Sequence, residues 1–371
     1  MKQIIQLVAF NIPYPPDYGG VIDVFYKIKA LYECGVIIHL HCFEYNRPQA
    51  VVLEKYCESV YYYKRPKGIN YQRSLKPYIV VTRANRQLIN NLSFLKAPIL
   101  FEGLHTCYYL NHPMLKDHVK LVRTHNIEHE YYHHLYSAEK NFIKRAFYRI
   151  EAFKLKRFEA ILKEANHLLC ISPNDYAYFN KKYHHSHLIP AFHPYNEIKS
   201  KPGKGEYILF HGNLSVAENI QAVTFLVDEV VDKINFPVII AGKDPSESLV
   251  QKISLHANVR LIANPNQQEM ESLIENAHIS LIPTFQDTGI KLKLLASLFS
   301  GRFCITNSMM TDNTGLEHLC YKADSPEEMI EAVNVVLLKE FTVEDIEKRK
   351  QVLDESFSNH QNAMKIIDLL I

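Results

Sequence analysis

The sequence predicts an α/β protein made of two doubly wound, Rossmann-like domains that face each other across a cleft. Its 371 residues suit two domains of about 150–200 residues each. Short apolar runs alternate with helical stripes along the chain, as in parallel sheets joined by crossover helices. A stretch rich in Pro, Gly and Lys at 190–205 interrupts this alternation, as a linker does. We therefore expect an N-terminal domain over 1–195, a C-terminal domain over 206–355, and a last segment, 356–371, that packs back on the first domain as a helix.

The first 45 residues show the repeating unit most clearly. A buried strand is expected over 4–10, followed by a loop rich in Pro, Tyr and Gly. From Val21 onward, apolar residues recur at the i, i+3, i+4, i+7 spacing of a helix, and Gly35 is placed to end it. A second apolar run over 36–43 completes a strand–helix–strand unit. A crossover of this length implies parallel pairing with a right-handed connection.

The same reasoning predicts the later elements. Further strands are expected at the other short apolar runs, which lie at 58–62, 98–101, 119–123, 166–171, 207–211, 237–241, 258–262, 278–282 and 303–306. A long helix is expected over about 138–165, and a final helix over about 359–371. The last helix ends in apolar residues, which need a surface to bury against.

Composition excludes several classes of protein. The chain has 42 basic and 40 acidic residues, so no net field favours nucleic acid. Its seven cysteines are scattered without a C-x-x-C pair, which argues against a zinc ribbon or a redox dithiol and fits a reducing compartment. The apolar run at the N-terminus is too short for a membrane span or a full signal peptide. We therefore expect a cytoplasmic protein.

Ligands in open parallel sheets bind beyond the carboxyl ends of the strands. After the first strand, the paired glycines Gly19 and Gly20 precede a helix, where a phosphate can approach the backbone and the helix dipole. A plain turn is the alternative interpretation. The absence of G-x-G-x-x-G at this point argues against a dinucleotide oxidoreductase.

Two later strand ends carry ionisable side chains. One bears Glu102 and His105, and the next is followed by His125. A histidine at a strand end suits proton transfer or hydroxyl binding. Read literally, His125 to His129 is also H-x-x-E-H, an inverted zinc-hydrolase motif, although that motif needs both histidines on one helix.

In the second half, cations gather near an expected helix start. Thr288 and Gly289 are expected to open a helix, and Lys291 and Lys293 follow at once. A diphosphate at this helix start would meet free N–H groups, the dipole and at least one ammonium group. Because residues two apart on a helix point in different directions, we expect one lysine to face the ligand and the other to face solvent, unless the first turn is irregular.

These motifs together resemble the retaining glycosyltransferases of family four, which have the GT-B fold. The resemblance covers nearly the whole chain. It rests on Arg123-Thr-His-Asn-Ile-Glu128, on Gly212-Asn-Leu-Ser215 followed by Asn-Ile-x-Ala, and on Gly-Ile-Lys-Leu-Lys at 289–293. The runs Ile-Ala-Gly-Lys-Asp-Pro at 240–245 and Ser-Gly-Arg at 300–302 also fit.

The resemblance implies specific roles for these residues. The C-terminal domain would hold a UDP- or GDP-linked sugar, with no metal and no other cofactor. His125 would contact the transferred sugar, and Lys291 or Lys293 would stabilise the leaving diphosphate. The residues implied to bind the donor are Gly19, Gly20, Gly212, Asn213, Lys243, Thr288, Gly289, Ile290 and Ser297. The residues implied on the acceptor side, for a glycan or lipid-linked acceptor, are Glu102, His105, Asn126 and Glu128.

The chain also departs from the family pattern. The usual pair of glutamates falls on Thr288 and Ala296, so Ser297 is left to replace a ribose-binding carboxylate in part. The usual Arg and Lys of the C-terminal domain fall on Asn213 and Glu218. Besides an active transferase of polysaccharide or glycoconjugate synthesis, two hypotheses therefore stay open: a non-catalytic relative that acts as a scaffold, and a zinc hydrolase through His125 and His129.

A basic segment at 140–157 raises the question of a membrane partner. Basic amphipathic helices lie on anionic membranes, and transferases of this kind often act on lipid-linked acceptors. Interleaved glutamates favour a solvated helix face instead. We expect at most weak peripheral binding, at the inner face of the membrane.

Overall fold

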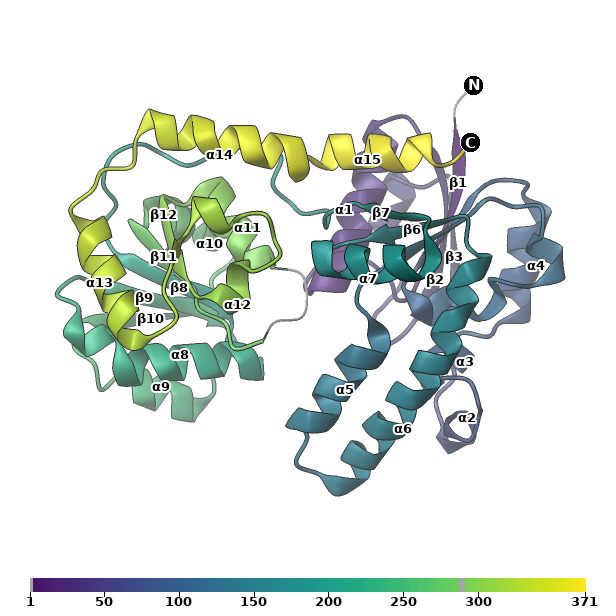
Figure 1. Ribbon diagram of the computed structural model, residues 1–371, viewed down its shortest axis with the longest axis horizontal. Coiled ribbons are helices and arrows are strands. Elements are labelled where there is room, and N and C mark those ends of the chain that lie inside the picture. Colours follow the sequence, from purple (N-terminus) through teal and green to yellow (C-terminus); the bar gives the residue numbers. More distant parts are fainter. Residues whose placement is uncertain (1–2, 287–290) are drawn as a thin grey trace. The chain divides into compact units, whose positions relative to one another are not determined.

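The computed structural model describes residues 3–286 and 291–371. The chain divides into two compact units, each built on a parallel sheet flanked by helices (Figure 1). The first unit contains the residues up to Pro194 together with Ser356–Ile371, and the second contains the described residues between Tyr195 and Glu355. Two parallel sheets with flanking helices confirm the predicted α/β class of two doubly wound domains.

The first sheet has seven strands in the order β3-β2-β1-β4-β5-β6-β7, all in parallel register. The strands are β1 (Ile4–Ala9), β2 (Ile37–Glu44), β3 (Ser59–Lys64), β4 (Ile99–Glu102), β5 (Lys120–Thr124), β6 (His167–Cys170) and β7 (Ser186–Leu188). The central strands are buried along their length, which explains their continuous apolar runs. The strand order reverses between β1 and β4, which is where such a sheet binds ligands.

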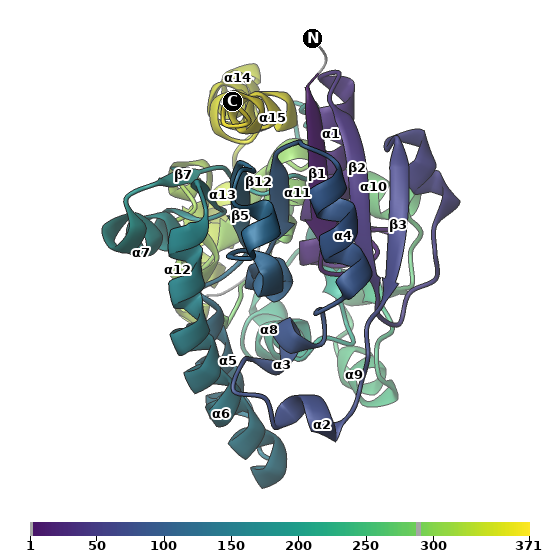
Figure 2. The ribbon, with the colours of Figure 1, turned by 90° about the vertical axis from the view of Figure 1, so that its right-hand side faces the viewer.

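Helices cover both faces of this sheet. They are α1 (Gly19–Glu33), α2 (Ile69–Gln72), α3 (Tyr78–Val81), α4 (Arg86–Phe94), α5 (Glu128–Ala138), α6 (Phe142–Phe158), α7 (Pro173–Tyr183) and α15 (Asn359–Asp368). One face packs against α1 and α15, where Ile366 of the last helix joins the core around Val24 and Ile28. The other face packs against α3, α4, α6 and α7, through residues such as Leu155. Figure 2 shows α5 and α6 side by side as a hairpin that extends beyond the sheet.

The second sheet has six parallel strands in the order β10-β9-β8-β11-β12-β13. They are β8 (Ile208–Asn213), β9 (Val238–Lys243), β10 (Val259–Ala263), β11 (Ile279–Leu281), β12 (Phe303–Thr306) and β13 (Tyr321–Lys322). The helices of this unit are α8 (Ala217–Glu229), α9 (Glu247–Ile253), α10 (Gln267–Asn276), α11 (Leu292–Ser300), α12 (Ser308–Thr311), α13 (Pro326–Leu337) and α14 (Val343–Ser356). The helices α10 and α11 cover one face, where Ile274 and Ala296 pack on Leu209.

The long helix expected over about 138–165 is present as α6, continued by a 3₁₀ helix, η4 (Glu159–Glu164). It begins at Phe142, because the side chain of Asn141 accepts hydrogen bonds from the N–H groups of Ile143 and Lys144 and so caps α6. The separate helix α5 ends at Ala138.

Two short strands, β7 and β13, were not expected at all. Each has only two or three residues and no apolar run of its own, so each is defined by its neighbour in the sheet.

Two predictions from composition concern the cysteines and membrane-spanning segments. All seven cysteines are free thiols, and five of them are buried. Over the residues described, no helix combines the length and the apolar character needed to cross a bilayer.

Candidate functional site

A buried network of four charges lies at the carboxyl edge of the first sheet. The ammonium of Lys27 is 2.8 Å from Asp23 Oδ2 and 2.9 Å from Glu102 Oε1. Arg123 donates two hydrogen bonds to the carboxylate of Asp23, of 2.8 and 3.1 Å. Burial alone would raise the pKa of Asp23, but Arg123 and Lys27 together lower it below its ordinary value. With two cations and two anions, the network is neutral and ties α1 to β4 and β5.

This network orients His125, which follows the end of β5. Its Nε2 atom is 3.1 Å from Glu102 Oε2. Because a carboxylate only accepts hydrogen bonds, Nε2 carries a proton, and Nδ1 is the ring nitrogen left to contact a hydroxyl group. The ring of Phe10 packs against the imidazole edge to face, with centroids 5.4 Å apart. The ring of His125 is therefore fixed in place from two sides, by Glu102 and by Phe10.

Glu102 itself does not reach a ligand. Its side chain is fully buried and is engaged by Lys27 and His125. The prediction that Glu102 contacts the acceptor is therefore wrong; it is a positioning residue that acts through His125.

His105 and Glu128 form a second pair beside His125. Their Nδ1 and Oε1 atoms are 3.7 Å apart, and both atoms are buried without a hydrogen-bond partner. Gly103 makes room for the ring, since a Cβ atom there would lie 2.7 Å from His105 Nδ1 and its φ is +72°. A single hydroxyl group could bind both orphaned atoms, which relieves the cost of leaving them unpaired.

The ionisation of this pair follows from its surroundings. Burial lowers the pKa of His105 well below its ordinary value, and the positive charge of Arg83 adds to the effect. Burial raises the pKa of Glu128 to about 8, with a further contribution from the charge of Asp175. At neutral pH, the histidine is therefore an uncharged imidazole and the glutamate is mostly protonated, so both are suited to binding a hydroxyl.

The remaining predicted residues of the first unit also lie near this edge. Gly19 and Gly20 begin α1, and a Cβ atom on Gly20 would lie 2.8 Å from the Phe10 ring. No side chain caps this helix start. Asn126 is half-buried between β5 and α5.

The structure contradicts the zinc hypothesis. His129 Nδ1 is 3.1 Å from Glu159 Oε2, whereas His125 binds Glu102, so the two histidines serve different carboxylates. His125 precedes α5 and His129 lies inside it, so they do not share a helix face. Among the described residues, Asp23, Glu102 and His125 do bring ligand atoms within 4.8 Å of one another. Lys27 and Arg123 already neutralise those carboxylates.

In the second unit, Lys293 lies in the first turn of α11. Its ammonium donates a 2.7 Å hydrogen bond to Asn219 Oδ1 of α8 and lies 5.3 Å from the centroid of the Phe210 ring. Burial lowers the pKa of Lys293 to about 8, while Glu218 raises it in part and Lys291 lowers it further. A partly dehydrated ammonium at a helix start favours an anionic ligand.

Lys291 differs from the expectation. It occupies the N-cap position of α11 with non-helical backbone angles, and its Nζ donates a 2.8 Å hydrogen bond to the carbonyl of Gln286. Both lysines are half-buried. The chain is not yet helical at Lys291, so the alternative of an irregular first turn applies, and neither lysine is fully exposed.

Beside Lys293, Asn219 also donates a hydrogen bond to the carbonyl of Asn213 at the end of β8, and the end of β9 pairs with it in register. A Cβ atom on Gly242 would lie only 1.8 Å from the carbonyl oxygen of Gly212, so the two strand ends touch through their glycines. Asn213 pairs in register with Lys243, and both side chains are exposed. This surface lies at the carboxyl edge of the second sheet, beside the start of α8.

One predicted donor contact is wrong. Ser297 is fully buried, and its Oγ lies 3.0 Å from His211 Nε2. Burial lowers the pKa of His211 to about 3, with the charge of Lys293 adding to the effect. Ser297 therefore supports the core beneath Lys293 and cannot replace a ribose-binding carboxylate. Ala296 is buried as well. Thr288, Gly289 and Ile290, also predicted to bind the donor, lie outside the described residues.

Sequence reasoning missed several residues of these sites. Asp23 and Lys27 are four residues apart on the apolar stripe of α1, and charges on a buried stripe were a signal that could have revealed the network. Asn219 belongs to the Asn-Ile-x-Ala run quoted for the resemblance, but no contact with Lys293 was predicted for it. It is significant only because α8 places it opposite Lys293.

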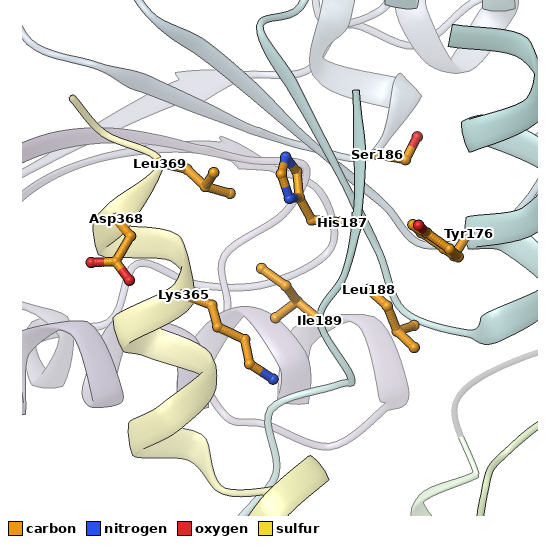
Figure 3. Close-up of a pocket in the computed structure, with 8 residues that line it drawn as sticks. All are labelled: Tyr176, Ser186, His187, Leu188, Ile189, Lys365, Asp368 and Leu369. Atoms are coloured by element: carbon orange, nitrogen blue, oxygen red, sulfur yellow. The ribbon is translucent and has the colours of Figure 1, made fainter. Parts of the chain in front are cut away.

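A separate hollow of about 530 Å³ lies between β7 and α15 of the first unit (Figure 3). Its lining includes His187 and Leu188 of β7 and Lys365 of α15. His187 Nε2 is 3.1 Å from His167 Nδ1. None of the predicted site residues lines this hollow.

No protein-family model matches the sequence. Comparison with solved structures defines the class of fold, which is that of the GT-B glycosyltransferases. The apo structure of OtsA superposes with a TM-score of 0.65 at 9% identity over 99% of both chains. HepE of Anabaena, in complex with UDP and glucose, superposes with a TM-score of 0.63 at 12% identity, also over 99% of both chains. At these identities, the likeness shows the fold alone.

One curated protein is similar to the chain in sequence. A 44.6 kDa protein of Klebsiella pneumoniae, described as uncharacterized and lying in a cps region, is 27% identical over 338 residues. The match covers 86% of each chain.

Proposed function

We propose that this protein is a glycosyltransferase that moves a sugar from a nucleoside-diphosphate donor to a glycan or lipid-linked acceptor. The observation that carries the proposal is Lys293, a half-buried ammonium at the start of α11, close to the exposed residues at the ends of β8 and β9. Neighbours in fold support this assignment, since HepE was solved with UDP and glucose and an E. coli protein with UDP-2-fluoro glucose. We favour UDP as the donor nucleotide for the same reason.

The second unit supplies the electrostatics of the reaction. As the bond between the sugar and the diphosphate breaks, negative charge develops on the leaving diphosphate. Lys293, Lys291 and the free N–H groups at the start of α11 would stabilise that charge. In this proposal, the lysines do the work that a metal ion does in other transferases, and the reaction proceeds with retention of configuration, as the resemblance to family four implies.

The first unit supplies the groups for sugar and acceptor hydroxyls. His125 presents Nδ1 as a hydrogen-bond acceptor because Glu102 fixes its Nε2 atom. His105 and Glu128 offer an adjacent pair of unpaired polar atoms. We propose that these three residues bind sugar hydroxyls. Such hydrogen bonds orient a reactant before the chemical step.

A membrane contact fits this function, and α6 is its candidate surface. Phe142, Ile143, Ile150 and Phe153 of α6 are all more than half exposed. The segment 140–157 carries seven basic residues and one acidic residue, and that acidic residue, Glu151, is buried against the N–H of Tyr78. An exposed apolar stripe flanked by cations suits the surface of an anionic bilayer. We propose that the protein works in the cytoplasm with this hairpin on the membrane.

Co-sedimentation with vesicles tests the membrane contact. Wild-type protein should sediment with phosphatidylcholine vesicles that contain phosphatidylglycerol, and replacing Phe142 and Phe153 by serine should abolish this binding. The matched control is Phe94→Ser, because Phe94 is 92% exposed but lies on α4, away from the hairpin. Equal binding by the control and the double variant would reject the hairpin as the contact surface.

Donor binding tests the function itself. Calorimetric titration with UDP-, GDP- and ADP-sugars should show binding of at least one donor, and incubation with that donor should release the nucleoside diphosphate slowly even without acceptor. If none of these nucleotide sugars binds, the result would instead favour a second candidate function, that of a non-catalytic scaffold. That candidate has one observation in its favour: Glu218, which accepts a hydrogen bond from Thr284, places a carboxylate near Lys293 where an anionic donor would approach.

A further inference from the structure

Two arginines of the first unit, Arg65 and Arg83, are not part of its neutral network of four charges. Arg65 follows the end of β3, and Arg83 follows α3. Arg83 is only 4% exposed, and its guanidinium donates to the backbone carbonyls of Phe10 and Ile79. Arg65 Nε donates a 2.9 Å hydrogen bond to Thr82 Oγ1, next to Arg83 in the chain. The two guanidinium groups therefore lie close to each other at the carboxyl edge of the sheet.

Neither arginine is neutralised by the protein. Among the described residues, no carboxylate lies within ion-pair distance of Arg65 or Arg83. The buried cations Lys27 and Arg123, by contrast, each pair with a carboxylate. Burying a guanidinium without a counter-ion is costly. Burial lowers the pKa of Arg83 to about 9, and the charge of Arg65 lowers it further.

The arrangement around Arg65 fixes its guanidinium. The group stacks on the ring of Tyr45 with a distance of 4.2 Å to the centroid, and the ammonium of Lys67 lies 4.9 Å from the same ring. Stacking occupies the face of the guanidinium and leaves its edge for hydrogen bonds. This positive cluster adjoins the His105–Glu128 pair, because the charges of Arg83 and Arg65 both act on His105.

We propose that Arg65 and Arg83 bind a phosphate or diphosphate group of the acceptor. This inference rests on the proposed function, since it assigns the acceptor's chemical class. A planar guanidinium binds phosphate oxygens through two parallel hydrogen bonds. Two arginines with Lys67 beside them carry up to three positive charges, which match the charge of a phosphate monoester or diphosphate better than that of one carboxylate. A phosphate held there would place a neighbouring sugar hydroxyl near His105 and Glu128.

Pyrophosphate is the probe for this site. Titration into the full-length chain should reveal two sites, of which Arg65→Gln weakens one about tenfold or more, whereas Lys293→Gln weakens the other. The matched control is Lys64→Gln, which removes the same charge from the preceding, exposed residue of β3 and should leave both sites unchanged. If thermal unfolding shows that Arg65→Gln is misfolded, Lys67→Gln should still weaken the same site about two- to fivefold.

Competition then distinguishes the two sources of such a phosphate. Stronger displacement of pyrophosphate by n-octyl phosphate assigns a lipid-linked acceptor, and stronger displacement by glucose 6-phosphate assigns a soluble sugar phosphate. Failure of both, or equal weakening by Lys64→Gln and Arg65→Gln, overturns the inference. If wild-type protein binds no nucleotide sugar but Arg65→Gln still removes a pyrophosphate site, only the proposed function fails. If wild-type protein binds a nucleotide sugar but Arg65→Gln leaves pyrophosphate binding unchanged, only the acceptor-site inference fails.

Discussion

Replacing Lys293 by glutamine removes one positive charge from the proposed donor site while keeping a side chain that can contact Asn219. In the wild-type protein, the half-buried ammonium of Lys293 is held 2.7 Å from Asn219 Oδ1 at the start of α11. A hydrogen bond between a charged group and a diphosphate contributes about 1.5–3 kcal/mol, so the affinity for UDP should fall about 10- to 150-fold. Calorimetric titration of UDP into both proteins measures this difference.

The pH dependence provides an independent check on the same residue. Since the pKa of Lys293 is lowered to about 8, its ammonium loses its proton as the pH rises through that value. Wild-type affinity for UDP should therefore fall above pH 8, and the affinity of Lys293→Gln should not. The matched control is Lys233→Gln, which removes an exposed lysine that precedes β9 at the opposite end of the strand. Unchanged UDP affinity in Lys293→Gln, or an equal loss in the control, would refute the assignment.

Three further predictions concern stability, measured by urea unfolding. Because the pKa of Glu128 is raised to about 8, the folded state binds more protons than the unfolded state between about pH 4.5 and 8. Measured as the difference from Glu128→Gln, which lacks this titration, the free energy of unfolding of wild type should fall by more than about 1 kcal/mol over that range. Lys27→Met leaves two buried carboxylates with one cation and should destabilise by about 3–5 kcal/mol. Lys29→Met, on the same helix but only half-buried, should change stability by less than about 0.5 kcal/mol. Gly242→Ala should destabilise by several kcal/mol or prevent folding, because its Cβ would meet the carbonyl of Gly212 at 1.8 Å. Wild-type stability of Lys27→Met or of Gly242→Ala would contradict the reasoning, as would an unchanged pH dependence in Glu128→Gln.

The strands could be predicted because a parallel sheet covered on both faces needs continuous apolar runs. Within one or two residues, each predicted run became a strand. β7 was beyond such reasoning because Ser186-His187-Leu188 has no apolar run, and its pairing with β6 defines it. For α6, the apolar spacing indicated a helix, and Phe142 and Phe153 on it are 78% and 62% exposed. Periodicity shows that a helix is amphipathic but not what covers its apolar face.

The site was predictable where chain position alone sets the chemistry. His125 and Lys293 were found because strand ends and helix starts bind ligands. Arg65 and Arg83 were missed because their significance lies in the absence of nearby carboxylates, which only the tertiary structure reveals. Ser297 was wrongly assigned because the sequence cannot show that its hydroxyl meets His211 in the core.

Hydrogen exchange with and without a bound nucleotide sugar tests the central claim most directly, because it locates the ligand without altering the protein. The donor should slow amide exchange at the end of β8, at the start of α8 and in the first turn of α11 around Lys293. Binding that leaves the amides around Lys293 unprotected while slowing exchange elsewhere would contradict the account.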